Sequence, residues 1–325
     1  HQPRRQRQMC IRDRCGVGSP IQSDEGHAET SVHPRGLKTH VWPAKQGGLM
    51  TVLETFMSLE SWNLIALGAV VFIGLPHGAM DGALAVHFGW MGRPGKAAAF
   101  LLTYVGLAAL VVAAWAVAPV LSFISFLAIS IYHFGRGDAS ANPFGQITVE
   151  SIARGGVVIG GISQVHRSEV NDVFQTLVGI DTTGVWLFLD AVVVVSLVCI
   201  AEVLLFKDRS ERTAFAIELS ALFLLFLVAP PLLGFAVYFC FVHSYRHFSS
   251  MRGVLQSTVS SLRITQTTVV FSLLTWAVGL VALAQLSSTV GVEPALLKVV
   301  FVGLAALTVP HMILVDGLLL SLIHI

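Results

Sequence analysis

The chain has 325 residues, of which 54% are hydrophobic and only 12% are charged. Soluble domains carry about 25% charged residues, so this composition, with a mean hydropathy of +0.75, excludes an ordinary soluble domain and favours a protein embedded in a bilayer. From residue 50 onward, 12 Lys and Arg stand against 15 Asp and Glu. This balance excludes a basic nucleic-acid-binding surface in that region.

Residues 1–49 differ in composition from the rest of the chain. They contain eight of the 20 Lys and Arg residues and four of the 12 His, and they contain no apolar run. We expect this segment to be disordered or non-native sequence before a start at Met50, rather than a basic tail that binds lipid or nucleic acid. Residues 50–325 are then expected to form one membrane-embedded domain. Its last residues, SLIHI, stop within an apolar run.

Apolar runs of membrane-spanning length recur from residue 59 to residue 320. A helix needs about 20 apolar residues to cross the hydrocarbon core, and it satisfies its backbone polar groups internally. We therefore predict an all-α, polytopic bundle of about eight to ten transmembrane helices around an intramembrane histidine cluster. The predicted spans are 59–76, 77–90 (short, or continuous with the first), 97–117, 118–135, 149–163, 184–206, 213–229, 231–249, 266–286 and 295–320.

Basic residues gather in three connections between these spans, at 93–96, 207–212 and 252–263. Cytoplasmic loops of membrane proteins carry an excess of Lys and Arg. We therefore expect these connections on the cytoplasmic side of the cell inner membrane, which the chain would cross several times. The polar stretch 163–183 is then expected to be a loop on the outer side.

Four histidines lie in segments apolar enough for a bilayer: His77 in GLPHGAMD, His133 in IYHFGRGD, and His243 with His247 in FVHSYRH. Ionisable residues at membrane depth usually face a bundle interior and mark functional sites. Because His243 and His247 are four residues apart, a helix presents both rings on one face, within reach of one metal ion. A lone membrane histidine is more often a hydrogen-bonding core residue, but this pair with two further histidines favours a metal site.

A fifth histidine and three carboxylates accompany these four. PHGAMD and PHMILVD each place an Asp, Asp81 or Asp316, four to five residues after a Pro-His pair, and YHFGRGD ends in Asp138. A carboxylate commonly fixes the tautomer of a metal-bound histidine, and we expect Asp81 and Asp138 to orient ligands in this way. We expect His311 and Asp316 to support the ligands rather than bind the metal, because four imidazoles already suffice.

The imidazole side chain of histidine limits which metal ions such a site would bind, and therefore which chemistry it could support. Neutral imidazole suits iron, copper, zinc and nickel. Four histidines closed around a tetrahedral ion would be structural, whereas four around six-coordinate iron leave two positions open for O₂. We expect Pro76 to kink its helix and Gly78 to let another backbone approach. An apolar cavity for a lipid-like substrate is expected to be lined by Phe126, Tyr132, Phe134, Phe239 and Phe241.

The motifs GLPHGAMD, YHFGRGD and HSYRH, in this order, resemble the bacteriorhodopsin-related-protein-like family of bacterial and archaeal β-carotene 15,15′-dioxygenases, over residues 60–320. The resemblance implies an integral membrane enzyme that uses Fe(2+) and O₂. Such an enzyme cleaves β-carotene at its central 15,15′ double bond to give two molecules of all-trans-retinal, which pass to a light-driven rhodopsin. The iron ligands that the resemblance implies are His77, His133, His243 and His247.

Three other classes of protein stay open from the residues alone. Paired histidines from two helices also ligate b-type haem, which predicts a Soret band. A di-iron lipid hydroxylase or desaturase usually carries more histidines, in HxxxH and HxxHH boxes, and this chain has one such spacing. Buried His and Asp side chains also form the relay of a transporter or proton channel, which predicts function without bound metal.

Overall fold

The computed structural model describes residues 59–139 and 144–319, and every regular element in these ranges is a helix. The prediction of an all-α membrane bundle is therefore confirmed. The predictions for residues 1–49 and for the last residues fall outside the described ranges. Within them, six helices are long and apolar enough to cross a membrane, and the count of eight to ten spans stays a prediction. The six are Ser61–His87, Pro94–Val117, Pro119–Asp138, Thr183–Phe206, Ser261–Val290 and Val292–Gly317.

The first span changes its helical winding three times without a break. α2 (Leu59–Ala69) continues into a π-helix, η1 (Val70–Gly74), then a 3₁₀-helix, η2 (Leu75–Met80), and then α3 (Asp81–His87). Pro76 lies in the first turn of η2 and has no N–H to donate to the preceding turn in η1. Residues 59–76 and 77–90 therefore form one continuous span, which is one of the two arrangements that the sequence allowed.

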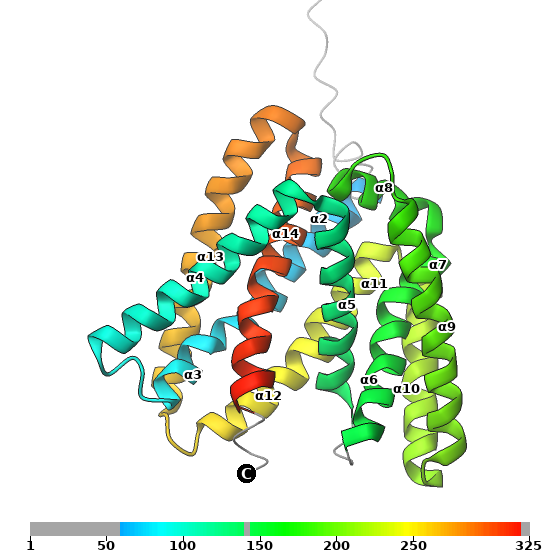
Figure 1. The fold of residues 1–325 in the computed structure, drawn as a ribbon, viewed down its shortest axis with the longest axis horizontal. Helices are drawn as coiled ribbons and strands as arrows, with labels where there is room; N and C mark the ends of the chain where they lie inside the picture. Colours follow the sequence, from blue (N-terminus) through cyan, green and yellow to red (C-terminus); the bar gives the residue numbers. More distant parts are fainter. Residues whose placement is uncertain (1–58, 140–143, 320–325) are drawn as a thin grey trace, which may run out of the picture. The chain divides into compact units, whose positions relative to one another are not determined.

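The other elements follow in chain order along the bundle (Figure 1). They are α4 (Pro94–Val117), α5 (Pro119–Asp138), α6 (Phe144–Gly156), η3 (Val157–Gly161), α7 (Ile162–Val165), α8 (Arg167–Val178), α9 (Thr183–Phe206), α10 (Arg209–Val228), α11 (Pro231–Val237), η4 (Tyr238–His243), α12 (Ser244–Leu255), α13 (Ser261–Val290), α14 (Val292–Met312) and η5 (Ile313–Leu319). Like η1, the elements η3, η4 and η5 are π-helices. Such turns frequently mark functional sites, and η1, η4 and η5 each begin or end next to a histidine-bearing segment.

The prediction of a loop at 163–183 is wrong, whereas its place on the outer side of the membrane stays a prediction. Most of this stretch forms α8, whose Val170, Phe174 and Leu177 are buried. These positions recur at helical spacing and give the helix one apolar stripe. The polar residues between them, such as Arg167 and Glu169, concealed this stripe in the sequence.

Two of the spanning helices turn most of their apolar surface outward. The most apolar windows of α4 and α13 are only 0% and 6% buried, respectively. Leu102 on α4 is 74% exposed, and Val278 on α13 is 71% exposed. Contiguous apolar surface of this extent is costly in water and marks contact with lipid or another protein. The three basic connections at 93–96, 207–212 and 252–263 lie at one end of the helices, the lower end in Figure 1.

Two glycines allow α5 to pack closely against α6. A Cβ at Gly135 would lie 1.7 Å from the Ser151 backbone oxygen, and a Cβ at Gly155 would lie 1.8 Å from that of Ile131. Small residues permit such close approach between membrane helices. We predicted a close approach of another backbone at Gly78. This prediction is wrong, because a Cβ there would meet no atom within 4 Å.

Candidate metal centre

Five buried histidines meet inside the bundle, and each is at most 8% exposed. They come from five different elements, η2, α5, η4, α12 and α14. The structure therefore brings together the four histidines that the sequence selected as ligands and His311, which the sequence selected as a supporting residue. We call this group the histidine cluster: His77, His133, His243, His247 and His311.

The rings of the cluster are in mutual contact. Eight of the ten possible pairs have ring centroids 4.9–6.2 Å apart. The nitrogens converge most tightly for His77, His133 and His243, where one nitrogen of each lies within 4.8 Å of the others. Nitrogens bound to one ion at about 2.1 Å lie at most about 4.2 Å apart. A small contraction would therefore let these three hold a single metal ion.

Several ring nitrogens in the cluster have no partner among the described residues. Both nitrogens of His243, and Nε2 of His247 and of His311, are buried without a hydrogen bond. A buried polar atom without a partner costs about 1–3 kcal/mol, and such a group calls for an explanation such as an ion. The donor set is entirely imidazole, which first-row transition metals accept. The residues present therefore fit a metal ion.

The backbone and Ser244 hold the ring of His77. Its Nδ1 lies 2.5 Å from the Gly74 carbonyl oxygen and 3.0 Å from Ser244 Oγ. A carbonyl oxygen only accepts, so Nδ1 carries the hydrogen and donates to Gly74. The lone pair of His77 is then on Nε2, which is the form that binds a metal.

Asp81 holds His311 rather than His77. His311 Nδ1 lies 2.9 Å from Asp81 Oδ1, and the other carboxylate oxygen accepts a 2.7 Å hydrogen bond from Tyr104. An ionised carboxylate accepts and does not donate, so the lone pair of neutral His311 is on Nε2. Asp81 therefore fixes the tautomer of a histidine, as we predicted, but the histidine is a different one.

The other two carboxylates also have unexpected partners. Asp316 Oδ2 lies 3.7 Å from His133 Nδ1, a distance that suits an ion pair but exceeds a hydrogen bond. Asp138 accepts a 2.7 Å hydrogen bond from Tyr238 and pairs with Arg246 at 3.3 Å. Asp316 is thus the carboxylate beside His133, whereas Asp138 contacts residues outside the cluster.

An apolar cavity reaches the cluster, and His77, His133 and His311 form part of its wall. Of the five aromatic residues predicted to line it, Phe126, Phe134 and Phe239 do so. Phe241 does not, because its side chain is 62% exposed, and Tyr132 is also absent from the wall. The remaining aromatic lining residues are Tyr104, Phe123, Phe174, Phe235, Phe271, Trp276 and Phe301.

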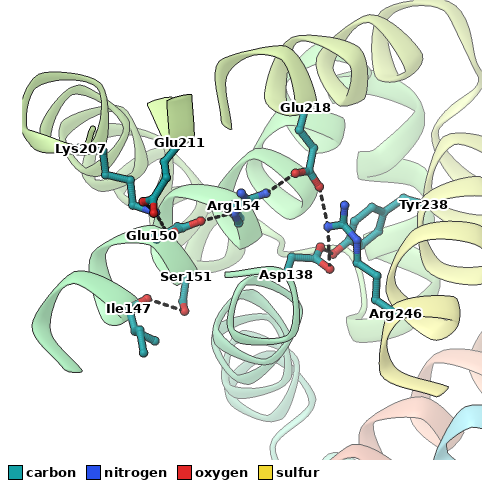
Figure 2. Close-up of polar contacts among 10 residues, drawn as sticks. All are labelled: Asp138, Ile147, Glu150, Ser151, Arg154, Lys207, Glu211, Glu218, Tyr238 and Arg246. Atoms are coloured by element: carbon teal, nitrogen blue, oxygen red, sulfur yellow. Dashed lines mark hydrogen bonds and ion pairs between the residues drawn. The ribbon is translucent and has the colours of Figure 1, made fainter. Parts of the chain in front are cut away.

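A chain of ion pairs holds the histidine-bearing helices against their neighbours (Figure 2). Lys207, just after α9, contacts Glu150 on α6 at 2.5 Å. Glu150 lies 2.8 Å from Arg154, which lies 2.8 Å from Glu218 on α10. Arg246 on α12 then bridges Glu218 at 2.5 Å and the Asp138 carboxylate at the end of α5. We call these residues the ion-pair chain: Lys207, Glu150, Arg154, Glu218, Arg246 and Asp138.

The sequence interpretation did not select Tyr104, Ser244 or most of the ion-pair chain. Tyr104 carried a usable signal, because it is the only ionisable residue within the apolar run from 97 to 117. Glu150 and Arg154 gave a similar signal at helical i, i+4 spacing. Ser244 gave none, because serine is common in membrane helices and its contact with His77 spans 167 residues.

Comparison with known proteins agrees with the motifs. The family described as β-carotene 15,15′-dioxygenase matches residues 68–319. A β-carotene 15,15′-dioxygenase of an uncultured marine bacterium (66A03) is 39% identical over 264 residues, which cover 80% of this chain and 95% of that protein. A probable β-carotene 15,15′-dioxygenase, Blh, of Halobacterium salinarum is 29% identical over 233 residues, covering 61% and 64% respectively. No solved structure matches the chain significantly.

The matched region is nearly the whole of the described helical bundle, and it contains every histidine of the cluster. The agreement therefore concerns the bundle and its interior, not one short motif. On this ground the chain belongs to the β-carotene 15,15′-dioxygenase family.

Proposed function

We propose that this protein is an iron-dependent membrane dioxygenase that cleaves β-carotene at its central 15,15′ double bond with O₂, giving two molecules of all-trans-retinal. The observation that carries the proposal is the buried histidine cluster at the wall of an aromatic cavity. The relatives named for this reaction support the substrate. The protein would act in the cell inner membrane, and its retinal would pass to a rhodopsin.

His77, His133, His243 and His247 would hold the iron through ring nitrogens. The convergence of three of these rings and the unpartnered nitrogens of His243 and His247 support this assignment. Iron(II), when bound, supplies open coordination positions and the electrons that activate O₂. Gly74 and Ser244 fix the ring of His77 by their contacts with Nδ1, which leaves Nε2 for the ion.

The cavity would bind the polyene on both sides of the cluster. Phe271 and Trp276 of α13 line it next to η2, which carries His77, and Phe174 of α8 lines it next to α5, which carries His133. Each half of a symmetric substrate would then occupy its own stretch of apolar wall, with its central bond near the two histidines. Burial of the polyene favours binding, and the filled cavity excludes water.

The reaction needs no general acid or base from the protein. Each carbon of the 15,15′ double bond receives one oxygen atom of O₂ as that bond breaks, so the products are two aldehydes and no external reductant is consumed. Among the described residues that line the cavity, none is a carboxylate, a lysine or an arginine. The chemistry of the wall therefore suits a reaction in which no net proton is transferred.

The packing of the cluster favours this function over axial haem ligation. A haem requires a flat slot between two axial histidines. Here His77 and His243, for example, are themselves 5.4 Å apart, and both are in ring contact with His247. A porphyrin would have to displace these rings. We therefore expect purified protein to show no Soret band.

Expression in bacteria that produce β-carotene tests the proposal. The expected result is loss of β-carotene with two molecules of retinal formed for each one consumed, measured by chromatography of extracted pigment. Under oxygen-18 gas, with immediate reduction of the aldehydes to prevent exchange with water, each product should carry one labelled oxygen. A His133→Ala variant is the control. A single longer apocarotenal, or unchanged β-carotene with iron-loaded protein, would contradict central cleavage.

A further inference from the structure

The five rings of the histidine cluster have a definite arrangement. Four of them form a closed cycle, in which successive centroids lie 5.4, 5.0, 5.2 and 5.7 Å apart. The order around this cycle is His77, His243, His133 and His311. His247 lies 4.9–6.2 Å from all four of these rings. The pairs across the cycle, His77 with His133 and His243 with His311, are not among the close ring contacts.

The eight ring contacts connect the histidines as the edges of a square pyramid connect its corners, with His247 at the apex. A metal ion at the centre of such a group would have five imidazole neighbours and one position without a ring, opposite His247. The cycle is complete only with His311, because it is the ring that joins His133 to His77. Four-histidine coordination would leave this ring in contact with three others, and its Nε2 would still lack a partner.

The partners of His311 are those of a metal ligand. Its Nδ1–H donates to Asp81 at 2.9 Å, and Asp81 accepts a second hydrogen bond from Tyr104 at 2.7 Å. Metal-binding histidines almost always donate their other ring nitrogen to a carboxylate or carbonyl, and that carboxylate is itself hydrogen-bonded. The remaining nitrogen, Nε2, is buried and unpartnered beside the other rings of the cluster. A metal ion bound to Nε2 would give this nitrogen the partner that it lacks.

The cavity reaches three of the four rings of the cycle. His77, His133 and His311 line it, whereas His243 and His247 do not. A position opposite the apex would be bordered by the rings of the cycle and would face the cavity. Substrate and O₂ would therefore approach the ion from the side opposite His247.

We propose that His311 is a fifth imidazole ligand of the metal, held in place by Asp81 and Tyr104, and that the coordination position opposite His247 faces the cavity. This inference rests on the metal centre of the proposed function, because it needs an ion in the cluster. It changes that function in one respect, since one position rather than two is open for exogenous ligands.

Cobalt(II) provides a probe whose visible absorption reports its coordination number independently of turnover. The full chain, purified in lipid nanodiscs, would be titrated anaerobically with cobalt(II) as wild type and as His311→Gly, Asp81→Asn and His87→Gly. His87 is the matched control, because its ring contacts Thr258 outside the cluster. Imidazole would then be added to each loaded protein. His311→Gln replaces the glycine variant if the latter does not fold.

The expected result is a changed absorption band in His311→Gly, an affinity at least about tenfold weaker, and recovery of the wild-type band with one equivalent of bound imidazole. Asp81→Asn should keep the band and lose about 10–100-fold in affinity, as supporting groups of metal ligands do. A wild-type band and affinity in both His311 variants would overturn the fifth ligand while leaving the proposed function intact. Wild-type protein that binds neither cobalt nor iron would overturn both.

Discussion

The Arg246 guanidinium lies 3.3 Å from the Asp138 carboxylate, and this contact joins the two helices that carry His133 and His247. Arg246 directly precedes His247 in α12 and follows His243, the last residue of η4, by three positions. The Arg246 side chain contacts Asp138 and Glu218, which both lie outside the cluster. Arg246 therefore links α12 to α5 through side chains that lie outside the histidine cluster.

Removal of the contact between Arg246 and Asp138 should weaken metal binding without removing any of the proposed ligands. We predict that Arg246→Met retains the fold but binds iron about tenfold more weakly, since groups that support metal ligands contribute 10–100-fold. Because the Arg246 side chain is 40% exposed, its loss should cost less stability than that of a buried ion. Anaerobic titration with iron(II) measures the affinity. Unchanged affinity would show that α5 and α12 are held by apolar packing alone.

Arg154 is the matched comparison within the same chain of ion pairs. Its side chain is only 8% exposed and bridges Glu150 and Glu218. Breaking such a buried pair typically costs about 3–5 kcal/mol, so Arg154→Met should lower the unfolding temperature far more than Arg246→Met. The fraction that stays folded should bind iron normally, because the side chains that Arg154 contacts among the described residues, Glu150, Glu218 and Phe215, are not in the cluster. If Arg154→Met weakened iron binding as much as Arg246→Met does, the two arginines would not have separate roles in stability and in metal affinity.

Gly135 should tolerate no larger side chain. A Cβ there would lie 1.7 Å from the Ser151 backbone oxygen, and a backbone atom cannot move without separating α5 from α6. Overpacking of this kind costs about 1–3 kcal/mol or more, so Gly135→Ala should be clearly destabilised in thermal unfolding. Gly106→Ala on α4 is the control, because a Cβ there meets nothing within 4 Å. Equal stability of the Gly135→Ala and Gly106→Ala variants would rule out the close contact between α5 and α6 at Gly135.

A larger residue at Gly78 should block the substrate and spare the metal. Gly78 lines the cavity next to His77, and a Cβ at this position enters open space. We predict that Gly78→Leu binds iron as wild type does but cleaves β-carotene with a higher KM or not at all. Iron content and the kinetics with β-carotene measure the two effects separately. Normal kinetics in this variant would mean that the polyene does not pass beside His77.

Removal of the metal should abolish activity reversibly. We predict that anaerobic chelation stops retinal formation and that added iron(II) restores it. Zinc, which imidazole also binds but which has no redox chemistry, should occupy the site and leave the enzyme inactive. Retinal yield after each treatment is the measurement. Full activity of metal-free protein would favour a function that depends on the His and Asp side chains alone.

The sequence predicted which histidines form the cluster better than it predicted which residues these histidines contact. Histidine is so unfavourable within an apolar run that His77, His133, His243 and His247 could be selected by composition alone. The partner of Asp81 could not be predicted in the same way. One-turn spacing favoured His77, but η2 is a 3₁₀-helix with about three residues per turn, so residues 77 and 81 do not share a face. The actual partner, His311, is 230 residues away.

The position of His311 is a second feature that could not be predicted from the sequence. Counting imidazoles suggested that four suffice, and this count treated His311 as a supporting group. Only the packing of α14 against η2 and α5 places its ring in the cycle with the others. Helix-to-helix contacts of this kind depend on complementary side chains along whole elements. A local motif such as PHMILVD does not contain that information.

The helix α13 has a further consequence for how the enzyme's kinetics must be measured. Phe271 and Trp276 line the cavity, whereas Leu274 and Val278 on the same helix are 59% and 71% exposed. A single helix thus lies between the cavity and the exposed apolar surface of the bundle. We predict that carotenoid dissolved in the acyl chains around this surface supplies the enzyme. The rate should accordingly follow the mole ratio of carotenoid to phospholipid, and dilution of the vesicles in buffer at a fixed ratio should leave turnover per enzyme unchanged.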